Sequence, residues 1–246
     1  MTAVCVSADA HHWGPTMLPI ILDKYKIMNH NKYKKTVEID LPMVHLKGDF
    51  SIPENMHGLV LFAHGSGSSR LSPRNQMVAT HLNDHGLGTL LFDLLTYDED
   101  RDYANRFNIP LLSQRLKDVT EWVWQQKEFE GVRTGYFGAS TGAAAALMAA
   151  RDLPQIAAVV SRGGRVDLAM KDLRFVKAPT LLIVGELDTE VLRLNEKAYR
   201  EILCEKKLEI VADSGHLFEE KGAMEKVAVL AANWFEMHLQ PLALYE

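Results

Sequence analysis

The chain has 246 residues, of which 47% are hydrophobic, and a formal net charge of −5. This length and apolar content suffice for one α/β domain around a single large core. Acidic and basic residues are interspersed and the aromatic residues do not alternate with a basic stripe, so the composition argues against nucleic-acid binding. Cys5 and Cys204 lie at opposite ends of the chain and match no disulfide framework or metal-ligand spacing.

Residues 1–35 show no clear periodicity, and we interpret them as an N-terminal extension of uncertain structure before a single domain over 36–246. The start of the chain lacks a basic segment followed by a long apolar run, which argues against a signal peptide and a membrane span. With two cysteines this predicts a cytoplasmic protein. The lysines of the extension are interpreted as a solvated face, and His11 and His12 as exposed residues, because no acidic or cysteine partner is near. No metal site or cofactor is predicted.

From Lys35 onward, alternating and wholly apolar runs predict strands, and apolar residues at helical spacing predict helices between them. The first two strands are expected to be antiparallel. The later strands are apolar on both faces, as strands buried between helix layers are. This order predicts an α/β fold: a mostly parallel sheet of about eight strands with helices on both faces. Strands are expected at 35–41, 44–52, 58–62, 88–95, around Tyr136 and Phe137, and at 156–161, 180–184 and 208–211. Helices are expected at 73–85, 109–126, 141–151, 166–172, 191–203 and 224–237.

The segment 134–147, TGYFGASTGAAAAL, predicts a strand, a very tight turn and a helix. Ser140 lies at the apex of the turn, and the glycines on either side remove Cβ atoms that would collide as the helix folds back on the strand. This is the pattern of a nucleophile elbow. Gly-x-Ser-x-Gly alone is weak evidence, since Ser140 could equally be an ordinary N-cap.

The rest of the chain favours the nucleophile. Asp188 follows the strand at 180–184, and His216 lies in a glycine-containing loop after the strand at 208–211. The order Ser140, Asp188, His216 is the one expected of α/β-hydrolases, in which the histidine takes the serine proton and the carboxylate orients the histidine. Glu186 and Asp213 are alternative carboxylates, although Asp213 is too close in sequence to His216 for the usual arrangement.

An oxyanion hole requires two backbone donors. We expect one from the amide of Thr141, directly after the nucleophile, and the other from the amide of Ser66, in the loop that follows a central strand. Gly65 and Gly67 on either side of Ser66 are expected to line the substrate site. The loop also resembles part of a phosphate-binding loop, but it lacks the Gly-Lys-Ser/Thr ending.

Arg162 and Arg165 follow the strand at 156–161, at the sheet edge where ligands of such folds bind. A guanidinium can donate two parallel hydrogen bonds to a carboxylate or phosphate, so either arginine could bind an anionic substrate. The alternative is that Arg162 pairs with an acid such as Asp167 or Glu186 and only holds the loop.

From about residue 36 onward the sequence resembles the α/β-hydrolase superfamily, and within it the dienelactone-hydrolase-like group of small bacterial hydrolases. The resemblance rests on five segments: LFAHGSGSSRLSPRN at 61–75, GYFGASTGAAAAL at 135–147, VVSRGGRVDLA at 159–169, PTLLIVGELD at 179–188 and SGHLFEE at 214–220. It implies the α/β-hydrolase fold with a minimal cap. Dienelactone hydrolases carry a cysteine nucleophile whereas position 140 is serine, which favours an ordinary serine esterase. Similar sequences also occur joined to phosphoribosyltransferase domains, and no such second domain is recognised here.

The sequence therefore predicts a serine hydrolase that cleaves esters or thioesters of small acyl groups through an acyl-Ser140 intermediate. The expected partner is a small-molecule substrate. A non-catalytic α/β-hydrolase-fold module that binds a ligand or a partner protein is the alternative. Only about eighteen residues separate the strands that end at Ser161 and begin at Thr180, which leaves room for a single short helix and predicts a shallow, open pocket. Sequence alone does not give the oligomeric state.

Overall fold

The computed structural model describes residues 33–240. The predicted extension over 1–35 therefore lies almost wholly outside the described residues, as do Cys5, His11 and His12. The first strand, expected to begin near Lys35, begins at Tyr33.

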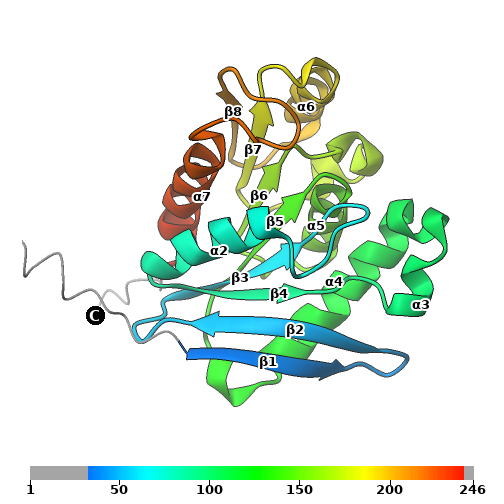
Figure 1. Ribbon diagram of the computed structural model, residues 1–246, viewed down its shortest axis with the longest axis vertical. Coiled ribbons are helices and arrows are strands. Elements are labelled where there is room, and N and C mark those ends of the chain that lie inside the picture. The colour runs from blue at the N-terminus through cyan, green and yellow to red at the C-terminus, as the bar shows by residue number, and fades with distance from the viewer. Residues whose placement is uncertain (1–32, 241–246) are drawn as a thin grey trace, which may run out of the picture. The chain divides into compact units, whose positions relative to one another are not determined.

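Eight strands form one sheet, in the order β1-β2-β4-β3-β5-β6-β7-β8 (Figure 1). The pairs β1–β2 and β2–β4 are antiparallel, and all other neighbouring pairs are parallel. The predicted fold class is thus confirmed. The strands are β1 (Tyr33–Asp40), β2 (His45–Ile52), β3 (Gly58–Ala63), β4 (Leu87–Phe92), β5 (Thr134–Ala139), β6 (Ala158–Arg162), β7 (Thr180–Gly185) and β8 (Lys206–Val211).

Two helix layers cover the sheet. The helices α2 and α7 bury one face with residues such as Leu82 and Phe235, while α4 and α5 bury the other with residues such as Leu116 and Ala146. Every residue of β3 to β7 is buried, which explains why these strands are apolar on both faces. The helices are α2 (Pro73–Asp84), α3 (Tyr97–Asp100), α4 (Ile109–Trp124), α5 (Thr141–Asp152), α6 (Thr189–Glu201) and α7 (Ala223–Leu239), with the short 3₁₀ helices η1 (Tyr103–Phe107), η2 (Lys127–Phe129), η3 (Val166–Ala169) and η4 (Leu173–Phe175).

Two local predictions need correction, and a segment for which no helix or strand was predicted forms short helices. The strand expected to reach residue 95 ends at Phe92, and Leu94 is buried in the following loop instead. The polar segment before α4 forms α3 and η1. In place of one polar helix at 166–172 the chain forms η3 and η4, whose residues Val166 and Leu173 are fully buried. These two turns pack against the domain and leave the cap minimal.

Candidate active site

The predicted site residues all follow the carboxyl ends of strands. Ser140 follows β5, Asp188 follows β7, and His216 lies in the loop after β8. Arg162 ends β6, and the glycine loop of Ser66 follows β3. Because β3 and β5 to β8 are parallel neighbours, these ends lie along one edge of the sheet.

Ser140 lies in a strained turn. Its φ of 50° and ψ of −120° are unusual for a non-glycine residue. Both glycines of the motif are needed for close approach. A Cβ on Gly142 would lie 2.1 Å from the carbonyl oxygen of Ala63, and a Cβ on Gly138 would lie 2.4 Å from the Cα of Ala143. The turn therefore presses the start of α5 against the ends of β3 and β5.

Backbone hydrogen bonds hold this turn. The Ser140 N–H donates to the Arg162 carbonyl at 3.1 Å, and the Ser140 carbonyl accepts from the amides of Ala143 at 3.1 Å and Arg165 at 3.0 Å. The Thr141 N–H belongs to the first turn of α5, where amides have no intrahelical acceptor, and it donates to no acceptor within residues 33–240. A donor at a helix N-terminus next to Ser140 is therefore available to a developing negative charge.

Asp188 and His216 are in direct contact. Asp188 Oδ2 lies 2.6 Å from His216 Nδ1, and the Asp188 side chain is only 14% exposed. When the imidazole is neutral and donates Nδ1–H to this carboxylate, its lone pair is on Nε2. Of the alternative carboxylates, Glu186 is engaged elsewhere, because its Oε2 accepts the Asp213 backbone N–H at 3.0 Å. The structure thus pairs His216 with Asp188.

Ser140 and His216 adjoin the same corner of β6. Arg162 accepts the Ser140 amide, and at the next residue a Cβ on Gly163 would lie 3.5 Å from His216 Nδ1 and Cε1. No hydrogen bond joins the Ser140 hydroxyl to the His216 ring in the part of the chain described. Such bonds are often long in the absence of substrate.

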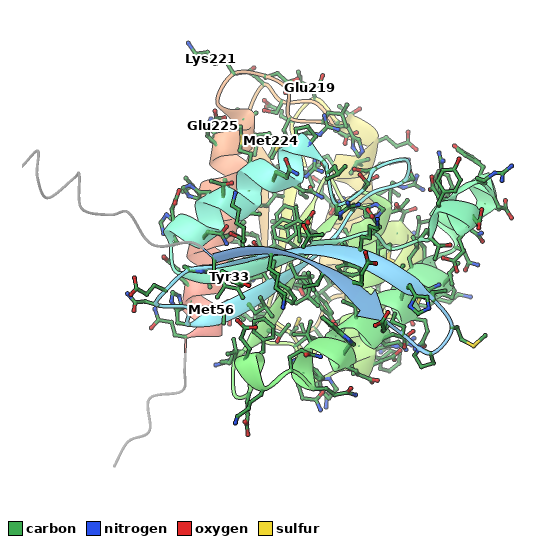
Figure 2. The ribbon with its side chains drawn as sticks, turned by 60° about the horizontal axis from the view of Figure 1, so that its bottom comes forward. Tyr33, Met56, Glu219, Lys221, Met224 and Glu225 are labelled. Carbon is green, nitrogen blue, oxygen red and sulfur yellow. The ribbon has the colours of Figure 1, made fainter. Side chains whose placement is uncertain are left out.

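The loop of His216 is held on both sides. The Gly215 N–H donates to Glu220 Oε1 at 3.0 Å, and Phe218 is buried with a φ of 54°. Figure 2 shows Glu219 in this loop before α7, and its carboxylate lies 3.2 Å from the Arg74 guanidinium of α2. These contacts fix the position of the imidazole relative to the sheet edge.

The glycine loop after β3 lies against the elbow. A Cβ on Gly65 would be 3.1 Å from the Ser140 Cβ, and Gly67 has a φ of 69°. The Ser68 N–H donates to the Gly65 carbonyl at 3.1 Å, which closes the turn. The Ser66 N–H donates to no acceptor within the described residues. This loop therefore supplies a second unpaired amide beside Ser140.

Arg162, the last residue of β6, and Arg165, in the loop that follows, differ in their contacts. Arg165 pairs with Asp167 through two hydrogen bonds of 2.9 Å, so the structural role considered for Arg162 belongs to Arg165. Arg162 is 7% exposed and has no acidic partner among residues 33–240. Its Nε is buried without an acceptor, and its guanidinium lies 6.0 Å from the Phe218 ring. Burial, with a smaller contribution from the charge of Arg74, lowers the pKa of Arg162 to about 10.

Sequence reasoning missed His64, Arg74 and Phe218. His64 directly precedes the glycine loop, and this position in the sequence could have marked it as a residue of the site. Arg74 belongs to α2, and the sequence does not show which elements this helix packs against. No local sequence pattern indicates that Phe218 has a positive φ.

The cavity beside the elbow is small. It has a volume of about 10 Å³ and is lined by the glycine loop, Thr141, Leu112 and Arg106, among others. A groove of about 360 Å³ lies over β1, β2 and α2, but none of the predicted site residues lines it.

Within residues 33–240, no group of three His, Cys, Asp or Glu side chains is arranged to hold a metal ion. In the same range, no helix is long and apolar enough to cross a membrane.

No family model matches the chain. It is 48% identical to a dienelactone hydrolase from Anabaena variabilis, whose crystal structure superposes with a TM-score of 0.83 over 86% of this chain and 100% of that one. The chain belongs to the dienelactone hydrolase family. This α/β-hydrolase also shares its fold with the esterase domain of a Rhodothermus marinus protein, at 17% identity and a TM-score of 0.69 over 84% of this chain and 99% of that one.

A curated relative of this hydrolase is described as a transferase and not as a hydrolase. A putative phosphoribosyl transferase of Mycobacterium tuberculosis is 52% identical over 204 residues, which cover 82% of this chain and 46% of the relative. The chain thus spans about half the length of the curated relatives it matches.

Proposed function

We propose that this protein is a serine hydrolase that cleaves carboxylic esters or thioesters of small acyl groups through an acyl-Ser140 intermediate. The observation that carries the proposal is the 2.6 Å contact between Asp188 and His216, at the same corner of the sheet as the strained Ser140. A serine hydroxyl is a poor nucleophile until a base takes its proton, and an oriented imidazole is such a base.

In the first half of the reaction, Ser140 Oγ attacks the substrate carbonyl carbon while His216 Nε2 takes the hydroxyl proton. The negative charge that forms on the carbonyl oxygen is stabilised by the Thr141 and Ser66 amides. Asp188 stabilises the imidazolium. The carbon–oxygen or carbon–sulfur bond then breaks, and the imidazolium gives its proton to the departing alcohol or thiol. Water, activated by the same imidazole, hydrolyses the acyl-enzyme and restores the hydroxyl.

We infer the size of the acyl group from the small cap. Between β6 and β7 the chain forms only the short turns η3 and η4, which leave little structure to cover a bound acyl chain. A long acyl chain would remain exposed and lose about 0.8 kcal/mol for each methylene left unburied. We expect kcat/KM to be highest for short acyl esters, and a steady rise toward long chains would contradict this.

Arg162 supports a preference for anionic substrates. A buried guanidinium without a carboxylate is costly unless a ligand neutralises it. Arg162 has this environment next to Gly163 and His216, whereas Arg165, the other arginine considered, is already paired. We therefore assign the anion-binding role to Arg162 alone.

The decisive experiment is the variant Ser140→Ala with fluorophosphonate labelling of the parent. We expect esterase activity to be lost, the thermal melt to change little, and mass spectrometry to find the adduct on Ser140. Labelling elsewhere, or undiminished turnover in the variant, would rule out the proposal. An unlabelled parent with no esterase activity would favour the alternative of a non-catalytic binding module.

A further inference from the structure

His64 is a buried histidine beside the candidate site that the mechanism above does not use. It directly follows β3 and is 8% exposed. Both ring nitrogens make hydrogen bonds: Nε2 accepts the Leu94 backbone N–H at 3.0 Å, and Nδ1 lies 3.0 Å from the Gly65 carbonyl oxygen.

These partners determine the tautomer. A backbone N–H can only donate, so His64 Nε2 must carry the lone pair. The proton of the neutral ring is then on Nδ1, which donates to the Gly65 carbonyl. Burial lowers the pKa of His64, and a second proton would remove the acceptor for Leu94. The neutral Nδ1–H form is therefore the one that satisfies every polar group here.

The bond to Gly65 fixes a peptide plane. The Gly65 carbonyl accepts from His64 Nδ1 and from the Ser68 N–H, so both of its lone pairs are used. No peptide bond among the described residues is cis. In a planar trans peptide the N–H points opposite to the C=O. Holding the Gly65 carbonyl toward His64 thus directs the Ser66 N–H away from His64, on a peptide whose Gly65 Cα adjoins Ser140.

The other end of the loop is tied to the same segment. Asp93, next to Leu94, accepts the Arg70 backbone N–H at 2.9 Å and pairs with the Arg70 guanidinium at 2.6 Å. The loop that joins β3 to α2 is thus anchored to the segment after β4 at its first residue by His64 and near its last by Arg70. The residues between these anchors include Ser66.

We propose that His64 is a positioning residue that orients the Ser66 amide as an oxyanion donor through its Nδ1–H bond to the Gly65 carbonyl. The inference rests on the esterase chemistry proposed above. His64 touches no reacting atom and acts on the reaction only through the glycine loop.

Two variants separate the two bonds of His64. Asparagine places an N–H donor near the position of Nδ1, so His64→Asn keeps the bond to Gly65 and loses the one to Leu94. Glutamine places an acceptor near the position of Nε2, so His64→Gln does the reverse. Removing an oxyanion donor costs about 10²- to 10³-fold in kcat, and misorienting one should cost at least about tenfold. We expect His64→Gln to lose at least about tenfold in kcat with KM nearly unchanged, and His64→Asn to stay within about threefold of the parent.

A transition-state analogue gives a second measurement. A trifluoromethyl ketone forms an oxyanion on reaction with serine, so its inhibition constant should rise in His64→Gln by about the same factor as kcat falls. Asn83→Ala is the stability control, because Asn83 is 2% exposed and donates to three oxygens of Ser51, Leu87 and Thr89. The control should melt at a lower temperature with kcat unchanged.

Nitrogen NMR of the parent protein tests the inference without any variant. We expect the His64 ring to be neutral and protonated on Nδ1 at pH 7 to 8, and an Nε2–H tautomer would overturn the inference. Equal kcat losses in the Asn and Gln variants, or parent-like kcat in the Gln variant, would also overturn it. These results leave the proposed function intact as long as Ser140→Ala is inactive. A parent with neither turnover nor phosphonate labelling refutes both.

Discussion

The ends of β3 and β6, with the loops that follow them, flank the elbow. They differ in whether their buried polar side chains have hydrogen-bond or ion-pair partners. In the loop after β3, His64 uses both ring nitrogens and Arg70 pairs with Asp93. Arg162, the last residue of β6 before its loop, is equally buried, yet its guanidinium has no acidic partner among the described residues. Both side chains are more than nine-tenths buried, so burial alone does not explain the difference.

The comparison separates two ways of building a site. A loop whose anchoring side chains are already paired is in its working geometry, and a substrate gains from it without ordering it. An unpaired buried charge destabilises the free protein, and it is compensated only when a ligand of opposite sign binds. The loop after β3 is thus suited to neutral and anionic substrates alike. Arg162 at the end of β6 distinguishes substrates by their charge.

The largest expected effect is on stability, at Gly142 of the elbow that lies between the two loops. Gly142→Ala would place a Cβ 2.1 Å from the Ala63 carbonyl, against backbone that cannot move without displacing β3. We expect a loss of roughly 3 kcal/mol or more in the free energy of unfolding, measured by chemical denaturation. Gly131→Ala is the control: Gly131 has a φ of 75° but open space around it, so it should lose only about 1 kcal/mol. Similar losses in both variants would refute the steric explanation.

The next effect tests the loop after β3. Asp93→Asn weakens the link to Arg70, so the loop that carries Ser66 should lose order. We expect kcat/KM to fall by about tenfold for neutral and anionic esters alike, because both need the same amide. Asp40→Asn is the matched control, since the exposed Asp40–His45 pair lies at the tip of the β1–β2 hairpin. A loss confined to one class of ester would contradict the comparison.

Arg162→Gln tests the loop after β6. Efficiency on a carboxylate-bearing ester should fall at least tenfold, about 1.4 kcal/mol, while the matched neutral ester is nearly unchanged. Because the variant removes an unpaired buried charge, its melting temperature should be equal to or above that of the parent. Arg165→Gln breaks the pair with Asp167 and should affect both esters equally. If Arg162→Gln also lowers both rates equally, the arginine is structural.

The smallest effect is a pH dependence of stability. Burial lowers the pKa of His64 below its ordinary 6.5, outweighing the opposing hydrogen bond to Gly65 and the carboxylates of Asp93 and Asp100. Below about pH 6.5 the unfolded chain binds a proton that the folded chain does not, so stability is complete above this pH and declines as the pH falls. We expect the melting temperature to drop by a few degrees from pH 7 to pH 5, and by less in His64→Asn. Parallel curves for the two proteins would contradict this assignment.

The sequence predicted the sheet because β3 to β7 are apolar on both faces, a pattern that is typical of buried parallel strands. It also predicted the strand ends that carry Ser140, Asp188 and His216, because glycines and charges follow each apolar run. The roles of these residues stay predictions until the variants are measured.

Partner choice could not be read from sequence. Arg162 and Arg165 are three residues apart with the same acids nearby, and only the direction of each side chain decides which one pairs with Asp167. The bond at His64 Nε2, which selects the Nδ1–H tautomer, likewise depends on Leu94, thirty residues away. Contacts of this kind arise from tertiary packing and leave no local pattern.

The polarity of the outermost strands has a consequence for self-association. Among the described residues, β1 and β8 each have a single neighbour in the sheet, so each has a free backbone edge. Such edges can template pairing with another chain, and charged side chains oppose it. β1 carries Lys34, Lys35 and Glu38, and β8 carries Lys206, Lys207 and Glu209. The domain should therefore resist aggregation through its sheet edges even at high concentration, although its interior strands are among the most apolar segments of the chain.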